Sequence, residues 1–200
     1  DKSNLAVMAV MAAYLMVTVA VLYLVVRRLL MARAERDEQI RLSNTDELTG
    51  CLNRRAYEDD INNKLSWTDT FVYVSMDVDG LKMVNDTMGH AAGDELIKGA
   101  ASCMTRCYGE NGKVYRIGGD EFAAIVFAGN EEFAQLKKNF DKKIASWHGK
   151  HVSSMVISSG YVFSDEKKWD SVYDMAKVAD RKMYDEKNKH YETKGLERRR

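Results

Sequence analysis

A pair of carboxylates between two short apolar runs constrains the fold more than any other feature of the sequence. Residues 114–115 and 123–127 are apolar, and Gly118-Gly119 is followed directly by Asp120-Glu121. Two glycines between apolar runs predict a β-hairpin with a tight turn in which both glycines adopt positive φ. Neighbouring carboxylates at a turn repel each other, which suits them to hold a divalent cation. The alternative is a solvated acidic turn.

A second acidic cluster lies upstream, at the end of a predicted strand. Residues 71–76 have the β-branched and aromatic content of a buried strand, and Asp77 and Asp79 follow them. An EF-hand is excluded because Leu81 and Lys82 stand where its loop needs an acidic or amide residue and a glycine. Two acidic strand ends separated by a helical crossover indicate instead a two-carboxylate Mg²⁺ site of the kind used in nucleotidyl transfer.

The N-terminal segment has the composition of a transmembrane helix. No charged residue occurs in 5–26, and a helix of that length spans about 33 Å. We assign 1–27 to a transmembrane helix, in preference to a secretory signal or a buried core helix. Arginines cluster in 27–36 whereas only Lys2 precedes the apolar run, so we expect a single pass through the inner or cell membrane with the rest of the chain in the cytoplasm. The absence of an initiating Met suggests the terminal part of a longer receptor.

Residues 28–45 are rich in helix formers and contain neither Gly nor Pro. They predict a stalk helix with an imperfect apolar stripe. Such a stalk is either merely amphipathic, or it pairs in parallel with a second copy and transmits signals; we favour pairing. The stripe consists of Leu29, Leu30, Ala34, Ile40 and Leu42.

Composition excludes some classes of function. The formal net charge is zero, so nothing indicates nonspecific nucleic-acid binding. Three cysteines do not form a disulfide framework, and a cytoplasmic domain would keep them reduced. Cys103 and Cys107 share a helical face, but no His or further Cys completes a metal site with them. We interpret them as packing residues.

The remaining pattern predicts one α/β (α+β) domain, a small mixed sheet with helices packed on it. We expect the first strand and the hairpin to be neighbours in the centre of that sheet, which would bring Asp77 beside Asp120 and Glu121. The predicted elements, in order, are a helix over 54–65, a strand over 71–76, a helix over 93–107, the hairpin over 113–127, a helix over 131–148, a strand over 152–163 and a helix over 169–188.

Five segments, in order and at matching spacing, resemble the GGDEF family of diguanylate cyclases. The resemblance covers residues 46–192 and leaves a short basic tail, 193–200. It implies a sheet like the palm of nucleotide cyclases and polymerases, preceded here by the transmembrane helix. It also implies that two GTP molecules are joined into cyclic di-GMP with release of two pyrophosphates, by a homodimer that pairs through its stalk helix and its active-site faces. The matching segments are 46–57, 77–94, 116–122, Ser158-x-Gly160 and 179–187.

The resemblance implies a metal and catalytic set. Asp77, the backbone carbonyl of Val78, Asp120 and Glu121 would bind Mg²⁺ or Mn²⁺. Asp120 or Glu121 would also assist deprotonation of the ribose 3′-hydroxyl. Attack of that hydroxyl builds charge on phosphoryl oxygens, which positioning and the metal stabilise.

The resemblance also implies the nucleotide contacts. Gly118 and Gly119 would let the backbone approach the nucleotide closely. The backbone amides of Leu81 and Lys82 would meet the β- and γ-phosphates, and Lys187 would add a positive charge there. Asn85 and Asp94 would recognise guanine, and Asp94 favours GTP over ATP. The alternative for the last two residues is helix capping. His90 is left out of the catalytic set.

The chain also departs from the family pattern. Where many members carry Arg-x-x-Asp, which binds inhibitory product, positions 109–112 read Gly-Glu-Asn-Gly, so we expect no such site. Gly80 replaces a commonly aromatic residue, and Tyr191 stands where a second phosphate-contacting Arg is frequent. No metal ligand is lost.

Residues of the entry motif are given a structural role. Asp46, Asn53 and Arg55 would fix the stalk to the domain through hydrogen bonds and an ion pair. Two other readings stay open beside an active cyclase: a catalytically silent GTP-binding regulatory module, and a signalling adaptor whose domain only dimerises.

Overall fold

The computed structural model describes residues 2–63, 65 and 70–193, so most of the predicted basic tail lies outside the described residues. The chain divides into two compact units, residues 1–43 and 44–200. Each unit is described by itself.

The first unit is a single helix, α1 (Lys2–Asn44), which runs without interruption through both the predicted transmembrane segment and the predicted stalk. Within the described residues it is the one helix long and apolar enough to cross a membrane, over Val10–Ile40 with a mean hydropathy of 2.1. Its apolar side chains are exposed, including Leu29 and Leu30 at 59% each. The predicted apolar helix is therefore present.

The second unit is built on a five-stranded mixed sheet in the order β1-β3-β4-β2-β5. The short β1 pairs with β3 in parallel, and the other three pairings are antiparallel. The predicted α+β class, with the first long strand beside the hairpin, is confirmed. The strands are β1 (Leu52–Asn53), β2 (Val72–Val78), β3 (Gly112–Arg116), β4 (Glu121–Val126) and β5 (Ile157–Phe163).

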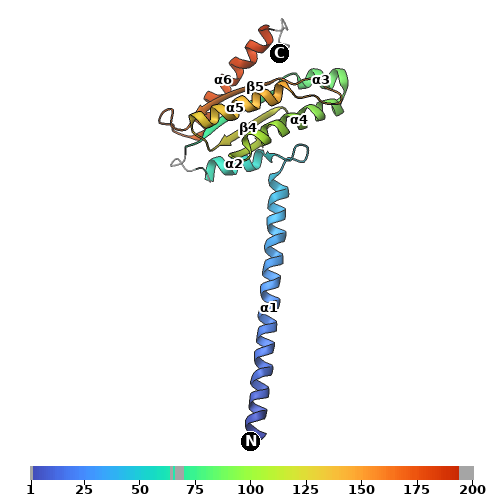
Figure 1. Ribbon diagram of the computed structural model, residues 1–200, viewed down its shortest axis with the longest axis vertical. Helices are drawn as coiled ribbons and strands as arrows, with labels where there is room; N and C mark the ends of the chain where they lie inside the picture. Colours follow the sequence, from blue (N-terminus) through green and yellow to red (C-terminus); the bar gives the residue numbers. More distant parts are fainter. Residues whose placement is uncertain (1, 64, 66–69, 194–200) are drawn as a thin grey trace. The chain divides into compact units, whose positions relative to one another are not determined.

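Helices cover both faces of the sheet (Figure 1). Buried side chains of α4 and α5 pack on one face, and those of α2 and α6 pack on the other. Because side chains alternate along a strand, β2 contributes Val72, Val74, Met76 and Val78 to the first layer. The helices are α2 (Arg54–Asn63), α3 (Leu81–Met88), α4 (His90–Tyr108), α5 (Asn130–Ala145) and α6 (Val172–Thr193).

Two element predictions are corrected. The sequence did not reveal α3, a short helix between β2 and α4, because Gly80 and Gly89 break the apolar periodicity on either side of it. The strand predicted over 152–163 begins only at Ile157, since the preceding residues form a loop that is pinned to α4. In that loop the Glu95 carboxylate accepts backbone N–H bonds from His151 at 2.7 Å and Val152 at 3.0 Å.

The edge strand β5 is closed by side chains of α6. The Lys182 ammonium donates to the backbone carbonyl of Tyr161 at 3.1 Å, and the Glu186 carboxylate accepts from the backbone N–H of Ser159. Unpaired backbone groups of an edge strand invite pairing with another chain. The two contacts block that pairing and fix α6 along the sheet.

Candidate functional site

The acidic residues of the two strand ends converge. Asp77 and Glu121 are cross-strand partners in the antiparallel β2–β4 register, so both side chains leave the same face of the sheet. The next residue of β2, Val78, donates its backbone N–H to the carbonyl oxygen of Asp120 at 3.0 Å. The predicted juxtaposition of residue 77 with the hairpin acids is therefore present in the backbone pairing.

Lys187 reaches this point from α6. Its ammonium lies 2.6 Å from Asp77 Oδ1 and 3.5 Å from Asp79 Oδ1. The Lys187 and Asp77 side chains are only 15% and 10% exposed. The structure thus joins Lys187 to the Asp77 carboxylate, whereas the sequence placed it only at the phosphates.

Burial and neighbouring charges shift the pKa values of both Asp77 and Lys187. Burial raises the pKa of the Asp77 carboxyl, and the neighbouring Asp120 and Asp79 push it the same way against the opposing effect of Lys187. Burial lowers the pKa of Lys187, but its hydrogen bond to Asp77 and the charges of Asp77 and Asp79 outweigh burial and raise it. The Lys187 ammonium therefore stays charged, while the Asp77 carboxylate is repelled by the carboxylates of Asp120 and Asp79.

Sequence reasoning missed the residues around Asp79. The Asp79 Oδ2 atom accepts a 2.7 Å hydrogen bond from Ser158 and lies 3.4 Å from His190 Nδ1. His190 Nδ1 is also 3.2 Å from Ser158 Oγ. The available signal was periodicity: Asp79 follows Asp77 by two, in the turn directly after the strand, and His190 follows Lys187 by three on a helix, so each pair is expected on one side.

The oxygens around Asp77 are potential ligands of a divalent cation. Among the described residues, no group of three or more His, Cys, Asp and Glu side chains is already gathered as metal ligands. The oxygens nonetheless suit a cation, because Asp120 and Asp79 repel Asp77, and Asp79 Oδ1 is buried without a hydrogen-bond partner. The residues fit such an ion, and Lys187 at present neutralises Asp77.

The predicted phosphate and guanine residues lie on α3 and α4. Gly80, at φ +78°, turns the chain from β2 into α3, and no side chain caps the first turn, which contains Leu81 and Lys82. The Asn85 amide packs so closely on Gly93 that a Cβ there would collide with it. Asn85 therefore lies beside the residue that precedes Asp94.

The capping alternative for Asn85 and Asp94 is wrong. Gly80 and Gly89 occupy the N-cap positions of α3 and α4, and Asp94 lies exposed inside α4. Helix capping therefore does not explain the polar side chains of Asn85 and Asp94.

The turn geometry predicted for Gly118 and Gly119 is also wrong. Neither glycine has positive φ, which the described residues show only at Gly50, Gly80 and Gly89. The reason is length, because the loop between β3 and β4 spans 117–120, and loops of four residues are most often built around a type I turn. A Cβ on Gly118 would stand 2.6 Å from Glu121 Oε2, whereas Gly119 faces open space.

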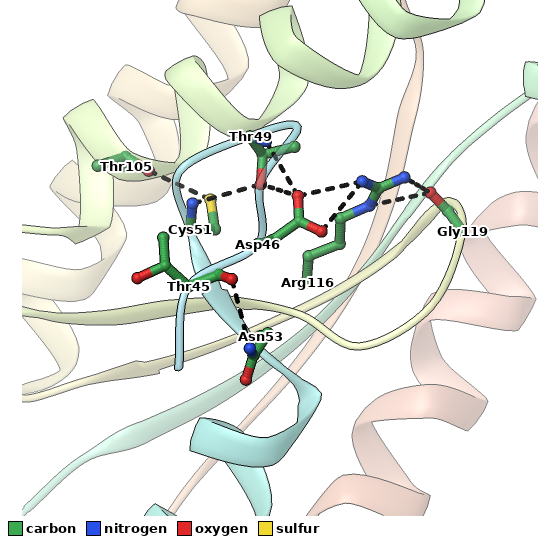
Figure 2. A network of polar contacts seen from close by, with 8 residues as sticks. All are labelled: Thr45, Asp46, Thr49, Cys51, Asn53, Thr105, Arg116 and Gly119. Carbon is green, nitrogen blue, oxygen red and sulfur yellow. Dashed lines mark hydrogen bonds and ion pairs between the residues drawn. The ribbon is translucent and has the colours of Figure 1, made fainter. Parts of the chain in front are cut away.

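Arg116 ties this turn to the entry motif, as Figure 2 shows. Its guanidinium donates to Gly119 O at 2.8 Å and to Asp46 Oδ1 at 3.1 Å. Burial raises the pKa of Asp46, but hydrogen bonds from Thr49 and Arg116 and the charge of Arg116 outweigh it and lower the pKa. Asp46 therefore forms an ion pair, and its cation is Arg116 of the hairpin, a partner that the sequence did not predict.

The other packing assignments fit the structure. Asn53 donates to the carbonyl of Thr45 at 3.4 Å, and Cys103 and Cys107 are buried free thiols. Asn111, in the segment that departs from Arg-x-x-Asp, donates to Glu132 at 2.8 Å.

An open groove of about 970 Å³ lies elsewhere, between α5, β5 and α6. It contains none of the predicted site residues. Its lining includes Phe133, Lys137, Tyr161, Phe163 and Lys182.

The family described as "Diguanylate cyclase, GGDEF domain" matches residues 43–193. The chain belongs to the GGDEF family. The match begins at the end of α1 and covers the whole described part of the sheet domain.

Individual relatives agree with this family assignment. The chain is 31% identical to the diguanylate cyclase DgcN of Escherichia coli over 169 residues, which cover 80% of this chain and 41% of DgcN. It is 34% identical to the cyclic di-GMP phosphodiesterase PdeB of Shewanella oneidensis over 84 residues, 42% of this chain and 10% of PdeB. The chain thus spans less than half the length of either relative.

A solved structure supports the fold. The crystal structure of the coiled coil and GGDEF domain of DgcB from Caulobacter crescentus, in complex with c-di-GMP, has a TM-score of 0.72 to this chain. The two are 25% identical, and the match covers 84% of this chain and 93% of that one.

Proposed function

We propose that this GGDEF protein is a diguanylate cyclase that condenses two GTP molecules into cyclic di-GMP and two pyrophosphates. The observation that carries the proposal is the pairing of Asp77 with Glu121, which brings both acidic strand ends to one face of the sheet beside Asp120. The family match and relatives named as diguanylate cyclases support the same activity.

The acidic set is proposed to hold Mg²⁺ or Mn²⁺. Asp77, the Val78 carbonyl, Asp120 and Glu121 would be its ligands, and the ion would neutralise charge that develops on the phosphoryl oxygens. Asp120 or Glu121 would accept the proton of the ribose 3′-hydroxyl. Repulsion of Asp77 by Asp120 supports this assignment, since carboxylates that destabilise one another gain from a shared cation.

The nucleotide is proposed to lie against the first turn of α3. The free backbone N–H groups of Leu81 and Lys82 would bind its β- and γ-phosphates, because an uncapped helix N-terminus favours anions. Gly119 would leave the chain open to the nucleotide. The side chains of Asn85 and Asp94 would together donate hydrogen bonds to guanine and accept hydrogen bonds from it. Adenine presents a different pattern of donors and acceptors.

A homodimer at a membrane is proposed for the whole chain. Each subunit would present one GTP to the other, and the exposed stripe of the stalk supports pairing: Leu29 and Ile40 are 59% and 52% exposed. The 10–40 stretch is compatible with a membrane anchor by length and composition, and the arginines after it favour a cytoplasmic domain. No product-inhibition site is expected at Gly109–Gly112, where Asn111 is already bonded to Glu132.

The test is turnover by the full chain in detergent micelles or nanodiscs. With GTP and Mg²⁺ we expect cyclic di-GMP, and Asp120→Ala should lower its formation by at least about a hundredfold. Asp185→Ala, on the exposed part of α6, is the matched control and should keep wild-type turnover. No product from the wild-type chain, even with a dimerising coiled coil fused at its N-terminus, would contradict the proposal.

A GTP-binding module without turnover is the second candidate. The ion pair between Lys187 and Asp77 favours it, because that contact occupies a proposed metal ligand. GTP binding without product, in the same preparation, would support this reading, and no GTP binding would leave only dimerisation.

A further inference from the structure

The feature that carries a further inference is the position of Lys187 between two carboxylates. Its ammonium is bonded to Asp77 Oδ1 at 2.6 Å, while Asp79 Oδ1 lies 3.5 Å away, buried and without a hydrogen-bond partner. An orphaned buried carboxylate oxygen is costly, and a charged donor within reach is the natural group to satisfy it. The ammonium thus forms an ion pair with both carboxylates, but it makes a hydrogen bond only to Asp77.

The side-by-side packing of β2 and α6 keeps Asp79, the second acceptor, in place. β2 and α6 run side by side, and four strand residues cover about 13 Å while ten helix residues cover about 15 Å. Contacts therefore recur in step along the two elements: Ser75 bonds Asp180, Asp77 bonds Lys187, and Asp79 lies next to His190.

Ser158 and His190 hold the far side of Asp79. Both approach Oδ2, Ser158 at 2.7 Å and His190 Nδ1 at 3.4 Å, and neither approaches Oδ1. Oδ2 is thereby committed, and Oδ1 is left pointing to the ammonium of Lys187. Ser158 comes from β5 and His190 from α6, so two separate elements hold this one carboxylate.

We propose that Asp79 is a second seat for the Lys187 ammonium, which moves from Asp77 Oδ1 to Asp79 Oδ1 when a divalent cation binds Asp77. The proposal rests on the proposed function, in which Asp77 is a metal ligand. Lys187 would then be a tethered competitor of the metal, and Asp79, held by Ser158 and His190, a positioning residue that lowers the cost of its displacement.

The exchange also serves the nucleotide. An ammonium has three donors, so Lys187 seated on Asp79 keeps donors for phosphate oxygens. The buried site avoids an unpaired charge at every stage, because cation binding at Asp77 and ion pairing at Asp79 occur together.

The test measures Mn²⁺ affinity without nucleotide, by the electron paramagnetic resonance of free Mn²⁺, on the full chain in detergent. Lys187→Met removes the competitor and should tighten Mn²⁺ binding by roughly tenfold, since one positive charge beside the ion is lost. Asp79→Asn removes the second seat and should weaken binding by roughly fivefold.

The combination of variants separates this account from simple charge effects. In the Lys187→Met background there is no ammonium to seat, so Asp79→Asn should change Mn²⁺ affinity by less than about twofold. Ser158→Ala keeps every charge but frees Asp79, and should weaken binding in the wild-type chain only. Asp185→Asn, which removes an exposed carboxylate of α6, is the matched control and should change nothing.

Three results would overturn the inference. Equal weakening by Asp79→Asn in both backgrounds would make Asp79 merely a nearby charge. Unchanged or weaker binding in Lys187→Met, with near-UV circular dichroism showing a native fold, would exclude competition by the ammonium. Absence of Mn²⁺ binding in the wild-type chain and all variants would remove the proposed metal site itself, and the inference with it.

Discussion

The two faces of β2 carry different kinds of side chain, apolar on one face and largely polar or acidic on the other. On one face every side chain is apolar, and Val72, Val74, Met76 and Val78 are fully buried against the α4 and α5 layer. On the other face the strand carries a buried tyrosine, then Ser75 and Asp77, and Asp79 follows in the turn directly after the strand; these last three side chains contact α6. A single seven-residue strand therefore carries both the core of the domain and its candidate site.

The difference lies in how each face is satisfied. The apolar face needs only contact, and its contribution scales with the area removed from water. The acidic face needs specific polar partners, which α6 supplies through Lys187 and His190 and β5 supplies through Ser158. Variants of the first face should therefore alter stability alone, and variants of the second should act chiefly on ion and nucleotide binding.

The largest effect is expected on the apolar face. Met76→Ala should lower the free energy of unfolding by about 2–5 kcal/mol, because it leaves a cavity in a fully buried layer. Urea unfolding measures this, with Met83→Ala, at a side chain that is 60% exposed, as the control. A loss no larger than that of the control would break the comparison.

A smaller effect on stability is expected at Ser75, on the polar face of β2. Ser75→Ala removes the hydroxyl that donates to Asp180 and should cost about 1–2 kcal/mol, since a carboxylate is left with fewer partners. Ser102→Ala, an exposed serine of α4, is the control in the same unfolding measurement. If Ser75→Ala stabilised the domain, the polar contacts between β2 and α6 would not be needed to hold the helix.

The smallest effect, and one that depends on pH, is expected at the entry motif. The pKa of Asp46 is lowered below its ordinary 3.8, so its ion pair with Arg116 contributes stability above that pH and loses it as the pH falls through the lowered value. Asp46→Asn should cost about 1 kcal/mol at pH 7, and this cost should shrink as the pH falls below 3.8 and Asp46 becomes protonated. Thermal unfolding across this range checks it.

Asp86→Asn, at an exposed position of α3, serves as the control for that pH series. A difference between wild type and Asp46→Asn that did not shrink at any pH below 3.8 would show that the carboxylate charge is not what Arg116 recognises.

Much of this organisation could be predicted from local sequence. Apolar runs fixed the long strands and the hairpin, and the acidic residues at their ends indicated where a site would form. The uncharged run 5–26 predicted the first helix, because nothing but length and hydropathy is needed for that inference.

Contacts between distant segments could not be predicted in this way. The ion pair of Lys187 with Asp77 joins residues 110 positions apart, and it depends on how α6 lies along the sheet. The turn at Gly118 and Gly119 was misjudged because its type follows from loop length, which is set by where pairing of β3 and β4 stops. The α3 helix was missed because it is only eight residues long and lies between Gly80 and Gly89, which interrupt the apolar periodicity.

The central claim is that the acids of β2 and of the β3–β4 turn share one cation. The most direct measurement is the anomalous scattering of Mn²⁺ in crystals of the full chain grown with GTP. The account predicts a peak within about 2.5 Å of carboxylate oxygens from both Asp77 and Asp120. A peak bound elsewhere, or none while Lys187 still contacts Asp77, would contradict it.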